Sequence, residues 1–147
     1  MSDLLARLDT LSAQRTARTD ALLASTHALL SRLDEVTEVG DSAEVDGCTL
    51  ERVRRSSNVG SAKFWKFERT SGTGCMLDSA LDSDRYLHGD FGCRIAGPTR
   101  GDLIAFALRA RDFVAAIVAA HSAEVHKLDV ALAEVAAATP GACEVSS

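Results

Sequence analysis

The first third of the chain carries apolar residues at nearly heptad spacing, with no proline or glycine between residues 3 and 36. This spacing predicts one long helix over residues 1–38, which Gly40 would end. Arg15 and Arg18 interrupt the apolar seam, so a continuous dry coiled coil would need acidic partners across the interface. The interruption otherwise marks a bend, a polar site or two arginines that reach toward water. The apolar positions are Leu4, Leu8, Leu11, Leu22, Leu29, Leu33 and Val36.

Short alternating runs, separated by glycine and serine, occupy residues 44–97. Runs of this length joined by short polar segments are typical of strands and hairpin turns. They predict a small antiparallel sheet, so the expected fold class is α+β. The glycine-rich segment 71–74 lacks the Lys-Ser/Thr of a phosphate-binding loop, and we interpret it as a hairpin turn. The expected strands are 48–54, 62–68, 74–77 and 86–95.

A second helical pattern begins after Pro98, which ends the last predicted strand. Thr99 and Asp102 form a variant of the capping box, and apolar residues then follow a period of 3.6, which predicts a helix over residues 99–137. Such a helix is about 58 Å long at 1.5 Å per residue and overshoots a small sheet. Its distal half therefore needs another partner, and we predict a homo-oligomer. Residues 138–147 are expected to form a loose tail of the single domain 1–147.

Composition narrows the class of protein. With 147 residues the chain has the length of one domain, and its net charge of −5 argues against binding long nucleic acids. Its four cysteines lie far apart without metal-ligand spacing, so we expect free thiols, no metal and no cofactor. The sequence has neither a signal peptide pattern nor the apolar run of about 20 residues that a bilayer requires. We therefore expect a cytoplasmic protein without a membrane partner.

Catalytic motifs are weak. There is no Gly-x-Ser-x-Gly elbow, and His121 and His126 are five residues apart, a spacing that does not place them on one helix face. His88 and Asp90 share a face of a predicted strand and could form a hydrogen-bonded pair, but a solvated polar face is the simpler explanation. We predict no catalytic residues and a protein that is not an enzyme.

Arginines and aromatic residues form the strongest remaining pattern. Arg94, Arg100 and Arg109 surround the junction between the last predicted strand and the second helix, and arginine binds phosphate well. Trp65 lies in an aromatic strand and could stack on a base, although a single tryptophan is more often a core residue. Arg100 and Arg109 border the apolar stripe of the helix, where they serve equally well to cover apolar surface.

The run Gly89-Asp90-Phe91, followed by Thr99-Arg100 and then Phe106-Ala107, resembles the first family of Thoeris anti-defence proteins of phages. The order of long helix, small antiparallel sheet and capped helix is similar too. Members of that family bind cyclic ADP-ribose isomers at sites between subunits and hold them without cleavage. The resemblance implies that Asp90 and Phe91 face the ligand, while Arg100 and Arg109 meet its phosphates. Gly92 departs from the asparagine expected after this run.

We therefore predict a sponge that sequesters a small cyclic nucleotide immune signal, either a cyclic ADP-ribose isomer or a cyclic oligonucleotide. The alternative is a non-enzymatic protein-interaction module, such as a phage inhibitor or assembly factor, that acts through its long helices. A hydrolase of the same nucleotides is a third interpretation. The predicted ligand-binding residues are Asp90, Phe91, Arg94, Thr99, Arg100, Arg109 and Trp65.

Overall fold

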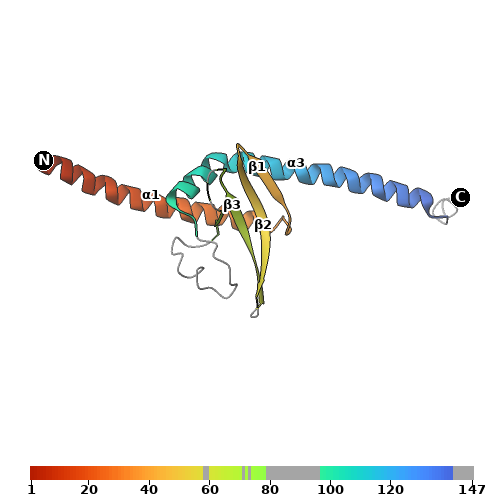
Figure 1. Cartoon of the computed structure of the whole chain (residues 1–147). Coiled ribbons are helices and arrows are strands. Elements are labelled where there is room, and N and C mark those ends of the chain that lie inside the picture. Colours follow the sequence, from red (N-terminus) through yellow and green to blue (C-terminus); the bar gives the residue numbers. More distant parts are fainter. Residues whose placement is uncertain (58–59, 71, 73, 79–96, 141–147) are drawn as a thin grey trace.

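The computed structural model describes residues 1–57, 60–70, 72, 74–78 and 97–140. Two long helices, α1 (Ser2–Asp34) and α3 (Arg100–Ala138), flank a four-stranded antiparallel sheet in sequence. The strand order is β1-β2-β3-β4, so each strand pairs with its neighbour in the chain. This arrangement confirms the predicted α+β class (Figure 1). The strands are β1 (Ser42–Val45), β2 (Cys48–Ser57), β3 (Gly60–Glu68) and β4 (Cys75–Met76).

The core lies between one face of the sheet and both helices. In the β2–β3 register Leu50 pairs with Phe67, and α1 and α3 contribute further apolar side chains to the same cluster. Phe67 meets Phe106 and Phe113 of α3 edge to face, with ring centroids 5.8 and 6.1 Å apart, and these two rings stack on each other. The aromatic cluster fixes α3 on the sheet.

The strand predicted for residues 86–95 lies outside the described residues, and β1 was not among the predicted strands. β1 and β2 are joined by Asp46 and Gly47, which both have positive φ (50° and 76°) as a two-residue hairpin turn requires. The Asp-Gly pair is the sequence signal for this hairpin. The four-residue length of β1 explains why its alternation alone did not reveal it.

α1 ends four residues before its predicted end, at Asp34, and Gly40 lies in the loop that follows. The Thr37 hydroxyl donates to the Leu33 carbonyl at 2.7 Å, and the Asp41 carboxylate accepts from the Glu38 N–H at 2.8 Å. These bonds hold the α1–β1 loop against the helix end and direct the chain into β1.

α3 begins as predicted. The Thr99 side chain accepts from the Asp102 N–H, and the Asp102 carboxylate accepts from the Thr99 N–H, which completes the capping box. After Ile117 the helix runs beyond the sheet, as its predicted length required. Figure 1 shows residues 2–18 of α1 and residues 118–138 of α3 leaving the sheet at opposite ends. We call these segments the α1 arm and the α3 arm.

Candidate functional site

Three predicted ligand residues, Asp90, Phe91 and Arg94, lie outside the described residues. Trp65 is fully buried in the core, where its Nε1 donates to the Asp34 carboxylate at 3.0 Å. A ring enclosed in this way offers no face to a nucleotide base. In this structure Trp65 therefore serves the core, and the function suggested for it as a stacking platform does not fit its burial.

Arg100 and Arg109 point to different neighbours. The Arg100 Nε donates to the Thr19 hydroxyl of α1 at 3.0 Å, whereas the Arg109 Nη1 donates to the carbonyl of Ala105 in its own helix at 2.9 Å. Nine residues, or about two and a half turns, separate the two arginines, so they lie on opposite sides of α3. The structure does not bring them together at one site. The Arg109 Nε is buried without a hydrogen-bond partner among the described residues.

The N-terminus of α3 is already bound by a carboxylate of the same helix. Asp102 is buried there, and its carboxylate pairs with Arg69 at 2.9 Å in addition to closing the capping box. The side chain of Thr99 is likewise engaged in the cap. Burial, and then the charge of Asp102, raise the pKa of the nearby Cys75 thiol, so the thiolate needed for nucleophilic chemistry is disfavoured.

An ion cluster around the buried Arg52 joins α1 to the sheet. The guanidinium of Arg52, on β2, lies 2.7 Å from Asp34 at the end of α1 and 3.6 Å from Asp78 after β4, and it covers the ring of Trp65. Burial raises the pKa of Asp78, while the Trp65 N–H and Arg52 oppose the shift. This cluster faces the core. Its ion pairs connect α1, β2 and the segment after β4, so its function is structural.

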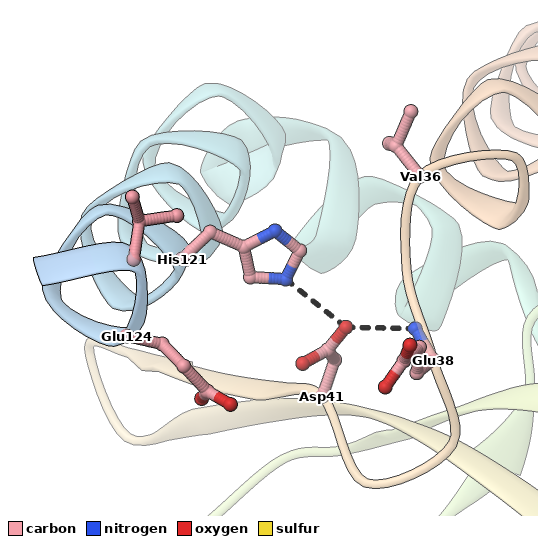
Figure 2. Close-up of a pocket in the computed structure, with 6 residues that line it drawn as sticks. Val36, Glu38, Asp41, His121 and Glu124 are labelled. Carbon is pink, nitrogen blue, oxygen red and sulfur yellow. Dashed lines mark hydrogen bonds and ion pairs between the residues drawn. The ribbon is translucent and has the colours of Figure 1, made fainter. Parts of the chain in front are cut away.

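An open, acidic pocket of about 290 Å³ lies where the α3 arm begins. His121 enters it from α3, and its Nε2 lies 3.1 Å from the carboxylate of Asp41 on the α1–β1 loop (Figure 2). Glu38 lies on the same loop, and Glu124 is one turn beyond His121 on α3. Three carboxylates thus line the pocket together with one imidazole, which makes the pocket complementary to a cation. Val36 and Val125 complete the described lining.

The arms carry the largest exposed apolar surface of the described residues. On the α1 arm, Leu4, Leu8 and Leu11 are 50 to 67% exposed. On the α3 arm the exposed fractions are 56 to 68% at five positions that recur at heptad spacing. Monomeric proteins rarely expose apolar residues in such a continuous row. The five positions are Val118, Val125, Leu128, Leu132 and Val135.

The acidic pocket was not predicted. Sequence reasoning set His121 aside because its spacing from His126 does not suit a metal, and Asp41 is 80 residues away in the chain. No local sequence pattern links these two residues. They come together only because α3 packs next to β1. The exposed row on the α3 arm, by contrast, follows from the predicted overshoot of that helix.

A scan against models of protein families, a search of curated proteins and a search of solved structures each gave no match for this chain. Within the described part, no group of three or more His, Cys, Asp or Glu residues is arranged to hold a metal ion. In the same part, neither long helix combines enough length and apolarity to span a membrane.

Proposed function

We propose that this chain is a non-enzymatic protein-interaction module and that its α1 and α3 arms form the binding surface. The observation that carries the proposal is the exposed heptad row on each arm. Most of the stability of helices in proteins comes from the packing of an apolar face, so an apolar row along an unpacked arm is best explained by a helical partner. The buried thiol of Cys75, with its raised pKa, is consistent with a protein that performs no covalent chemistry.

A photocrosslinking amino acid tests this proposal in the cell that naturally makes the chain. Placed at Leu8 or Leu128, it should yield protein adducts, because both positions belong to the exposed rows. Ala13 and Ala123 are exposed on the opposite sides of the same arms and serve as matched controls. Adducts at the row positions alone would support the proposal. Equal labelling at all four positions, or none at any, would overturn it.

A nucleotide sponge is the second candidate, and the unpartnered Nε of Arg109 favours it as a donor that lacks an acceptor. Because Arg100 and Arg109 diverge within one copy, a single phosphate site using both would need a second copy. A thermal-shift screen against cyclic ADP-ribose isomers, cyclic oligonucleotides, NAD and ADP-ribose tests this function. One cyclic species should stabilise the protein and be recovered intact, and Arg100→Ala or Arg109→Ala should abolish the shift. A flat response would reject the sponge.

A further inference from the structure

The polar positions within the two apolar rows suggest what covers them. The row on the α3 arm is apolar from Val118 to Val135 except at His121, which opens onto the acidic pocket. The row on the α1 arm is apolar at Leu4, Leu8 and Leu11 and then becomes basic at Arg15. One row therefore contains an arginine and the other a histidine at the edge of an acidic pocket, each next to an apolar stretch.

The two rows match when the arms run antiparallel. Both follow alternating steps of three and four residues, so successive positions of one row face successive positions of the other in reverse order. Setting Leu8 opposite Leu128 places Arg15 opposite His121, at the mouth of the acidic pocket. The full register pairs Leu4 with Leu132, Leu8 with Leu128, Leu11 with Val125, and Arg15 with His121.

Charge complementarity supports this register. The pocket around His121 contains the carboxylates of Glu38, Asp41 and Glu124, so an arginine delivered there would meet an excess of negative charge. An apolar seam interrupted by Arg15 needs such acidic partners to form a continuous coiled coil. The side chain of Arg15 is exposed in the single chain, where no described residue forms an ion pair with it.

The directions of the arms explain why a second copy can supply both partners. The chain runs the same way along α1 and α3, and the arms extend from opposite ends of the molecule (Figure 1). A twofold axis across the long dimension therefore brings the α1 arm of each copy antiparallel to the α3 arm of the other. Both rows are covered at once, and the interface closes on itself.

Pairing between identical arms is less favourable. Two antiparallel α3 arms, aligned to match their rows, would place Leu132 of one copy against His121 and the acidic pocket of the other. Two α1 arms would place Leu4 against Arg15 and leave the α3 row exposed. Each alternative brings an apolar side chain onto charged groups and would cost desolvation without an opposite charge.

We infer that the partner of the arms is a second copy of this chain, with the α1 arm of one copy lying antiparallel on the α3 arm of the other and Arg15 entering the acidic pocket. The inference rests on the proposed interaction function and specifies its partner. It also assigns Glu38, Asp41 and Glu124 as the receptor for that arginine.

Disulfide trapping tests the register in the full chain. In a background with Cys93→Ser and Cys143→Ser, the pair Leu8→Cys and Leu128→Cys should form a covalent dimer on mild oxidation. The matched pair Ala13→Cys and Ala123→Cys, on the outer sides of the arms, should remain monomeric. A dimer from Leu128→Cys alone that equals the yield of the pair would indicate α3–α3 pairing and overturn the inference.

Charge reversal tests the pocket. Arg15→Glu should weaken dimerisation about tenfold or more in analytical ultracentrifugation, because the change acts at both symmetric sites. Adding Glu124→Arg should restore much of the loss, whereas Arg7→Glu, on the same arm but outside the pocket register, should have a smaller effect. No loss with Arg15→Glu would overturn the pocket assignment. If the purified chain stayed monomeric while photocrosslinks captured a different protein, this inference would fail and the proposed function would stand.

Discussion

Arg52 shows how position along a strand determines the environment of a charged residue. Arg54, two residues further on the same face of β2, is exposed, whereas Arg52 pairs with Trp65 on the packed part of that face. Its side chain is 9% exposed, and its charge is balanced by Asp34 and Asp78. The cluster connects the end of α1, the sheet and the segment after β4, so it orients elements that are distant in sequence.

Arg52→Ala should therefore destabilise the fold, because it leaves two carboxylates without their cation. We expect a loss of about 2 to 4 kcal/mol in the free energy of unfolding, below the value for fully buried pairs because Asp34 is partly exposed. Urea denaturation followed by tryptophan fluorescence measures the loss. Arg54→Ala, at an exposed position two residues along the same strand, is the control and should change stability little. Equal effects of the two substitutions would contradict the assigned function of Arg52.

Asp78 makes a pH-dependent prediction. Burial raises its pKa above 3.8, so the folded state holds this proton more tightly than the unfolded state. Ionisation of Asp78 therefore lowers stability as pH rises through the raised pKa. Asp78→Asn removes that titration and keeps an oxygen to accept from the Trp65 N–H. The unfolding free energy of the wild type, minus that of the variant, should fall as pH increases above 3.8; a rise would contradict the assignment.

At the scale of elements, the ends of α3 and the presence of β2 and β3 could be predicted because their signals are local. Thr99 and Asp102 identify the helix start within four residues, and the apolar alternation around Phe67 identifies a strand. The end of α1 was placed too late because the terminating contacts come from Thr37 and Asp41, whose side chains act on backbone groups. Such side-chain contacts are harder to recognise in a sequence than a glycine that ends a helix.

The site residues were harder to predict for a physical reason. Sequence patterns show which residues share a face of one element, but not which elements bring their faces together. Arg100 and Arg109 are close in sequence yet lie on opposite sides of α3, whereas His121 and Asp41 are distant in sequence and 3.1 Å apart. The buried face of α1 was also obscured, because it includes Thr19 and Thr26 in place of leucines.

Thr99→Ala tests the capping box of α3. The substitution removes the acceptor for the Asp102 N–H, and a lost cap of this kind costs about 1 kcal/mol of stability. Thermal denaturation followed by circular dichroism at 222 nm measures the change. Thr16→Ala is the matched control, because the Thr16 hydroxyl is exposed and bonds only to the helix carbonyl of Ser12 among the described residues. If Thr99→Ala lowers the stability no more than Thr16→Ala does, the capping box does not contribute to the stability of α3.

For the whole molecule, α1 and α3 each have a packed segment and an exposed arm. This division connects the stability of the core with the association of two chains through their arms. The packed segments build the core with the sheet, and the arms continue the same two helices beyond it. Because each helix is continuous, ordering an arm against a partner also restrains the segment that packs on the sheet. Assembly through the arms should therefore stabilise the core.

This coupling predicts a melting temperature that depends on protein concentration. Association favours the folded chains by mass action, so the melting temperature should rise by about 3 °C for each tenfold increase in concentration. Leu8→Glu with Leu128→Glu places charges in both rows, leaves the core untouched and should remove the dependence. Ala13→Glu with Ala123→Glu adds the same charge on the outer sides of the arms and should retain it. Differential scanning calorimetry distinguishes the variants. A wild-type melting temperature that stays constant over a hundredfold range would mean that the arms do not join copies of the chain at these concentrations.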